Sequence, residues 1–294
     1  MFLERFIKKQ FISFYYDENY KLLIEHVKNK KIIDSYEKEF EKKEDIEKFI
    51  KEKINETPQT YVSSVLLTMN QGVMDNCSKQ KYLEKNIDYD NIKILCINNS
   101  YSFYASVYDI SKFLKEYKFP IDFLYSIFAV IDSLATERKN RFYVLVLHNY
   151  IAILGYENYK PLFSDFLILN EKDETEIEEI EEIDDLEIFD DIEDINENID
   201  EVSNDIEDID ENLEEKLNTL TTDIEVNILN HLKESLKDYY DNYSSDFIEK
   251  IIILDTVGID ISVTTLIEDE ILIPTEIQQI NLLKSINRLS IESV

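Results

Sequence analysis

The chain has 294 residues, of which 63 are acidic and 31 are basic, and its formal net charge at pH 7 is −32. This charge argues against binding to a nucleic-acid backbone or an anionic membrane surface, because both would repel it. Between Glu171 and Lys216 there are 25 acids and only two lysines, so the rest of the chain is only mildly acidic. The longest apolar run, FPIDFLYSIFAVI, is interrupted by Pro120 and Asp122 and is shorter than the ~20 residues of a membrane helix. The start, MFLERFIKKQ, lacks the long apolar region of a signal peptide, so we expect none.

Cysteine and glycine are both scarce. The two cysteines, Cys77 and Cys96, cannot make a disulfide framework, which predicts a reducing compartment. There are three glycines, Gly72, Gly155 and Gly258, where an average usage of ~7% would give about 20. Loops that bind phosphate with backbone amides usually need clustered glycines, and neither G-x-G-x-x-G nor G-x-x-x-x-G-K-[ST] occurs here. This weighs against an ordinary nucleotide enzyme.

In chain order, the first half reads as three strands, a helix and a strand, followed by further elements. The predicted strands are 11–16, 20–27, 31–40 and 60–69, with a helix over 42–54 that has Ile46, Phe49, Ile50 and Ile54 at helical spacing. Strands at 92–97 and 101–108, a helix at 109–117 and a buried helix from Asp122 to Leu134 follow.

The second half repeats this order after the polar break ATERKNR. A three-strand meander is predicted at 141–148, 150–156 and 160–169, then a helix with an apolar stripe from Ile224 to Tyr243, a buried strand at 247–255, a helix at 259–268, a strand at 273–280 and a helix at 281–289. Two successive β-β-β-α-β units predict an α/β chain with a duplicated ribonuclease-H-like fold, whose sheets carry helices on their faces.

Residues 232–286 carry the most specific resemblance, to the end of PilM and of the GspL cytoplasmic domain. These are actin-like proteins of type IV pilus and type II secretion machines. The matching positions are Leu236, Tyr239, Tyr240, Ile248, Ile251, Ile253, Leu266, Ile271 and Pro274. The resemblance implies an actin-like ATPase fold with a first subdomain at 1–136, a second at 137–170 and 218–294, and an acidic low-complexity insert at 171–217.

Three nucleotide-binding turns of the PilM family are altered in this chain. The place of the first phosphate loop reads YYDENY, from Tyr15 to Tyr20, and that of the second reads LHNYI, from Leu147 to Ile151. The adenosine-side turn reads DTVGID, with Gly258 as its single glycine. The resemblance therefore implies a pseudo-ATPase.

Individual polar residues give no catalytic, cofactor-binding or metal-binding assignment, and we expect no cofactor. His148 and Asn149 lie at a predicted hairpin tip, but a histidine without a partner at metal spacing is a weak signal. We expect Cys96 to be a buried small hydrophobe, since no base to activate a thiol can be named. The remaining candidates are expected to be structural, solvent-facing, turn-forming or placed by chance: His26, His231, Gly72, Asp17, Glu18, Asp255 and Asp260.

The acidic segment has apolar residues at regular spacing, from Ile177 to Ile195 and from Ile199 to Leu217. With almost no basic partners, like charges oppose an isolated helix, so a solvated linker is one reading. An amphipathic segment that folds on a basic, apolar-grooved partner is the other.

These observations predict a non-catalytic scaffold of a type II secretion, type IV pilus or DNA-uptake machine. The resemblance implies that its partners would be an inner-membrane assembly protein and a secretion ATPase, with no nucleic acid and no direct membrane insertion. The location would be cytoplasmic, peripheral to the inner membrane through a protein partner. Two alternatives stay open: a weak or regulated ATPase of the same fold, and an acidic inhibitor or nucleic-acid mimic.

Overall fold

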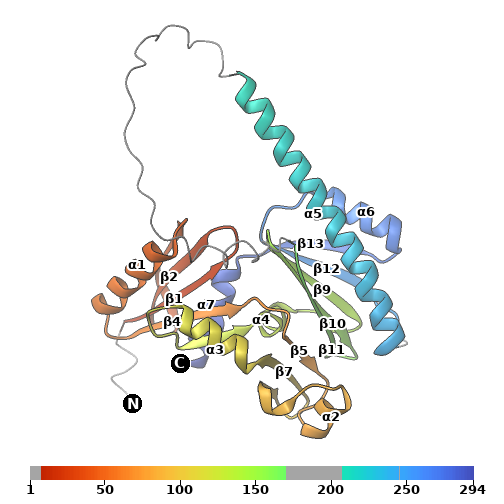
Figure 1. Cartoon of the computed structure of the whole chain (residues 1–294), viewed down its shortest axis with the longest axis horizontal. Helices are drawn as coiled ribbons and strands as arrows, with labels where there is room; N and C mark the ends of the chain where they lie inside the picture. Colours follow the sequence, from red (N-terminus) through yellow and green to blue (C-terminus); the bar gives the residue numbers. More distant parts are fainter. Residues whose placement is uncertain (1–7, 170–206, 245) are drawn as a thin grey trace, which may run out of the picture.

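The computed structural model describes residues 8–169, 207–244 and 246–294 (Figure 1). Two five-stranded sheets form its centre. The first contains β1 (Lys9–Tyr16), β2 (Tyr20–Lys28), β3 (Lys31–Phe40), β4 (Thr60–Leu66) and β8 (Phe123–Ser126), in the order β3-β2-β1-β4-β8. The second contains β9 (Arg141–Val146), β10 (Tyr150–Glu157), β11 (Lys160–Ile168), β12 (Lys250–Asp255) and β13 (Thr275–Gln279), in the order β11-β10-β9-β12-β13.

The two sheets share one topology. In each sheet the first three strands form an antiparallel meander, and the first strand then pairs in parallel with the fourth, as β1 does with β4 and β9 does with β12. The fifth strand adds in parallel to the fourth. The repeated order predicted from the sequence is therefore the order observed.

Helices separate and cover the sheets. The helices α4 (Ile127–Leu134) and α7 (Leu282–Ser293) lie between the two sheets, where a core joins residues of both. The outer face of the second sheet is covered by α5 (Glu207–Asn242) and α6 (Ser262–Ile271), and α1 (Lys43–Glu56) covers the outer face of the first (Figure 1). Period-3.6 apolar spacing explains α1, whose Ile46 and Ile50 are fully buried.

A small unit is inserted between β4 and β8. It contains β5 (Gln71–Met74), α2 (Lys79–Glu84), β6 (Ile92–Ile97) and β7 (Tyr101–Ser106), and its sheet order is β5-β7-β6. The helix α3 (Val107–Glu116) leads from it back to the first sheet. β5 packs against β11 of the second sheet, where the Val73 backbone N–H donates to Ser164 Oγ at 3.0 Å.

Several local expectations were wrong. The helix expected from Asp122 to Leu134 is strand β8 followed by α4, because Ser126 Oγ accepts a hydrogen bond from Phe128 N–H and starts the helix there. Gly72 lies inside β5 and not in a turn. The strand expected to reach Tyr108 ends at Ser106.

The cysteine expectation was also wrong. Cys77 and Cys96 form a disulfide, and Cys96 is exposed on β6 and not buried. β6 is an edge strand of the three-stranded sheet, and three of its six side chains, those of Lys93, Leu95 and Cys96, are exposed. The pairing removes the basis for predicting a reducing compartment from the cysteine count.

Residues 171–206 of the predicted acidic insert lie outside the described residues, so the structure does not test that part of the prediction. Helix α5 begins at Glu207, well before the apolar stripe that starts at Ile224. Across the described parts of the chain, no helix is both long and apolar enough to cross a bilayer.

Candidate functional site

The turns after the first strand of each sheet meet at one buried carboxylate. Asp17 follows β1 and is fully buried, and His148 and Asn149 follow β9. The backbone N–H groups of His148 and Asn149 donate to Asp17 Oδ2 and Oδ1, each at 2.9 Å. His148 Nδ1 also lies 2.9 Å from Asp17 Oδ2. The turn after β1 and the turn after β9 thus bind each other through this carboxylate.

The Asp17–His148 pair favours its charged form. Burial alone would raise the pKa of Asp17, but the hydrogen bonds from the His148 side chain and from the two backbone N–H groups together lower it. The hydrogen bond with Asp17 raises the pKa of His148 above its usual 6.5, in spite of partial burial. The exposed Glu18 adds to this, since its Oε2 lies 3.7 Å from His148 Nε2.

A second carboxylate accepts hydrogen bonds from the backbone N–H groups of the turn after β12. Asp255 is fully buried, and its oxygens accept hydrogen bonds from the backbone N–H groups of Val257, Gly258 and Ile259 at 2.8, 3.0 and 2.9 Å. Gln279 Nε2 donates to the same carboxylate. Gly258 has a φ of 86°, which explains the glycine at this position. The backbone N–H groups of this turn are therefore bound by the side chain of the residue that precedes it.

A cavity of about 260 Å³ opens beside the first of these turns. It lies at the carboxyl ends of the parallel strands β1 and β4, where α/β sheets usually bind ligands. Four tyrosines line it: Tyr16, Tyr20, Tyr117 and Tyr150. Helix α3 adds Asp109, Lys112 and Glu116, but Glu116 already pairs with Lys43 at 2.9 Å and Asp109 accepts from Thr68 Oγ1 at 2.7 Å. Aromatic rings thus form much of the cavity wall, and two of its three charged groups are already engaged within the chain.

The other candidate residues are not brought into this site. His26 lies on β2 beside Gln10, 3.0 Å from its Oε1. His231 is buried on α5, and burial lowers its pKa. Asp260 is exposed and accepts from Ser262 N–H at 2.8 Å. No group of three or more potential metal ligands occurs in the segments that the structure describes.

The Asp17–His148 contact could not be read from spacing along the sequence, where His148 was judged only for partners at metal-ligand spacing. The two residues are 131 positions apart, and no motif joins them. The duplication is the one signal that could have found them, because both follow the first strand of a repeated unit. In a duplicated fold those two turns occupy equivalent places.

A family model described as a domain of unknown function, DUF8341, matches residues 142–294, which is more than half of the chain. The chain belongs to this family. A second model, the domain of unknown function DUF8569, matches residues 6–132. No curated protein matches the sequence of this DUF8341 protein.

Solved structures resemble the chain over nearly its whole length. A Bacteroides thetaiotaomicron protein with an actin-like ATPase fold and unknown function aligns over 96% of both chains, with a TM-score of 0.54 and 10% identity. A chain of the PilM–PilN type IV pilus biogenesis complex aligns over 95% of this chain and 90% of its own, with a TM-score of 0.51 and 12% identity. The cytoplasmic domain of EpsL, from the type II secretion system of Vibrio cholerae, aligns over 97% and 96%, with a TM-score of 0.43 and 9% identity.

The expected actin-like α/β fold, and the resemblance to PilM on which it was based, are confirmed by these alignments. At such low identity the likeness concerns the fold. What this DUF8341 chain does with the fold must be argued from its own residues.

Proposed function

We propose that this chain is a non-catalytic actin-like assembly component of a secretion, pilus or DNA-uptake machine, and that it acts by binding proteins. The proposal that the chain is non-catalytic rests on the Asp17 carboxylate, which accepts hydrogen bonds from the backbone N–H groups of His148 and Asn149. A nucleotide phosphate bound to those amides would have to displace a buried anion and would then lie beside it.

Asp255 supports the same proposal at a second turn, the one after β12. Its carboxylate accepts three backbone N–H groups of the turn after β12. Amides that already donate to a carboxylate offer an incoming ligand no unused donors. Both turns are thus stable without a nucleotide.

Titration of the protein with fluorescent ATP and Mg²⁺ tests the non-catalytic part. We expect no saturable binding below about 1 mM, the upper end of the usual range for enzyme substrates, and no phosphate release. The matched variant is Asp17→Ala, which removes the carboxylate from the two amides and should bind ATP more tightly than the native chain if the blocking argument is correct. Micromolar binding with turnover by the native protein would refute the scaffold proposal and favour the ATPase of the same fold.

The partner proposed is an inner-membrane assembly protein together with a secretion ATPase, and the proposed location is the cytoplasmic face of that membrane. Support comes from the fold that the chain shares with PilM in its complex with PilN. Co-expression with the short cytoplasmic tail of each candidate membrane protein should give a complex that survives size-exclusion chromatography. If no tail binds and deletion of residues 171–216 alone abolishes function, the acidic inhibitor or mimic would take precedence.

A further inference from the structure

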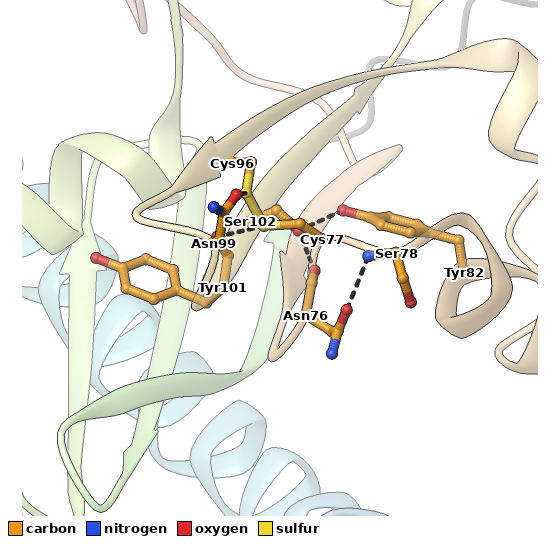
Figure 2. The surroundings of a disulfide bond; sticks show 8 residues. All are labelled: Asn76, Cys77, Ser78, Tyr82, Cys96, Asn99, Tyr101 and Ser102. Carbon is orange, nitrogen blue, oxygen red and sulfur yellow. Dashed lines mark hydrogen bonds between the residues drawn. A yellow bond between two sulfur atoms is a disulfide. The ribbon is translucent and has the colours of Figure 1, made fainter.

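The Cys77–Cys96 disulfide joins two parts of the small inserted unit (Figure 2). Cys77 lies between β5 and α2 and is half-buried, whereas Cys96 lies on the edge strand β6 and is exposed. The two sulfurs therefore differ in their access to solvent. Thiol–disulfide exchange depends on which sulfur an attacking thiolate can reach. Attack is therefore expected at the more exposed sulfur, that of Cys96.

Both sulfurs lie near oxygen acceptors. Cys77 Sγ is 3.3 Å from the Tyr101 carbonyl oxygen, and Cys96 Sγ is 3.7 Å from Asn99 Oδ1. A sulfur in a disulfide carries no proton, so neither contact is a hydrogen bond while the bond is intact. After reduction, each cysteine would have an S–H donor with an acceptor already in place. The surroundings therefore suit the dithiol as well as the disulfide.

The loop that carries Cys77 is also anchored without the bond. Ser102 Oγ donates to the Asn76 carbonyl oxygen at 2.5 Å and lies 2.6 Å from the hydroxyl of the fully buried Tyr82. The Ser78 backbone N–H donates to Asn76 Oδ1 at 2.8 Å (Figure 2). These contacts would hold the loop near β7 after the disulfide opens, so exchange does not require the unit to unfold.

We propose that Cys77–Cys96 is a reversible thiol–disulfide exchange site whose substrates are small thiols, with Cys96 as the sulfur attacked. A thiolate bonds to Cys96 Sγ, the Cys77–Cys96 bond breaks, and Cys77 leaves as a thiolate that takes a proton from water. A second thiolate then attacks the sulfur of the bound thiol. This releases the small-molecule disulfide and leaves Cys96 reduced, so two thiols are oxidised and one protein disulfide is reduced.

Peptide mapping of the native oxidised protein tests this proposal. The probe is β-mercaptoethanol, whose only charge is that of its attacking thiolate, because a chain of net charge −32 would repel a thiol that carries further negative groups. After brief exposure, acid quenching and alkylation, we expect the mixed disulfide on Cys96 and the alkyl group on Cys77. Adducts mainly on Cys77, or no exchange until denaturant is added, would overturn the proposal.

Two matched variants give an independent measurement. Cys77→Ser leaves only the Cys96 thiol, and Cys96→Ser leaves only the Cys77 thiol. With dithiodipyridine, a neutral aryl disulfide, we expect the Cys96 thiol to react about tenfold faster or more, because it is the exposed one. Equal rates, or a faster Cys77, would contradict the assignment, and the mapping of the native protein decides the question should either variant fail to fold.

Discussion

Asparagine forms the tight hairpin turns of this glycine-poor chain. Among the described residues, three turns have positive φ at two successive positions: Asn29 and Lys30, Asn98 and Asn99, and Asn158 and Tyr159. Positive φ at both central residues is the type I′ geometry, which matches the twist of the strands, and asparagine tolerates it better than most residues with a side chain. Hairpins can therefore form without glycine, whereas a turn that offers several unused amides to a ligand is harder to build without it.

The Asp17–His148 pair gives a pH-dependent contribution to stability. The folded-state pKa of His148 is raised, so its stabilising contribution is complete below the usual value of 6.5 and is lost as the pH rises through the raised pKa. The folded-state pKa of Asp17 is lowered, so its contribution is lost only as the pH falls through that lowered value.

The variant His148→Gln should therefore lose free energy of unfolding at pH 6 relative to the native protein and lose less at pH 8. The difference should be about 1 kcal/mol or less, since the ring is partly exposed. Urea unfolding at both pH values measures it. His26→Gln is the control, because burial lowers the pKa of His26 and its effect has the opposite sign. An equal loss for His148→Gln at both pH values would show that the protonation of His148 does not contribute to the stability of the folded state.

At the scale of elements, the repeated units could be predicted and the small inserted unit could be predicted only in part. Strands such as β1 and β12 have strong apolar patterns, so the spacing of their apolar residues and the turn residues beside them were enough to place them in the sequence. β5 has only four residues and α2 only six, too short to show a period. The disulfide and the Asp17 contact depend on long-range topology, which spacing along the sequence does not reveal.

The contact between β5 and β11 depends on Gly72. A Cβ at this position would lie 2.7 Å from the Tyr104 hydroxyl oxygen and 2.9 Å from Ser164 Oγ. We expect Gly72→Ala to lower the free energy of unfolding by about 1–3 kcal/mol, the usual cost of overpacking. Chemical denaturation measures the change, with Met69→Ala at an exposed position as the control. A loss no greater than that of the control would mean that the side chains of Tyr104 and Ser164 can move away from the added methyl group without cost.

At the scale of the whole molecule, α7 links the two halves. Leu283 and the fully buried Ile286 belong to the core between the two sheets, and Ser13 Oγ of β1 donates to the Leu283 carbonyl oxygen at 2.9 Å. A helix that follows the last strand of the second sheet thus completes the inner face of the first. The two halves should therefore unfold together.

Replacement of one buried side chain in α7 tests this dependence. Ile286→Ala should cost about 2–5 kcal/mol, as is usual for such a truncation in a core. Hydrogen exchange should then speed up in β1 and in β9 alike, whereas the exposed Glu292→Ala should change neither by much. Faster exchange confined to one sheet would mean that the halves are separate cooperative units.

The position of α7 also constrains the order in which the chain can fold during synthesis. β1 and β4 leave the ribosome early, but the helix that covers their inner face follows β13. Until Ile286 has been translated and has left the ribosome, part of the apolar inner face of the first sheet stays uncovered. Nascent domains often fold in order from the N-terminus. Here the inner face of the first sheet is completed only after the second sheet has been synthesised. The time for which that face stays uncovered therefore depends on how long the ribosome takes to translate the acidic segment and α5.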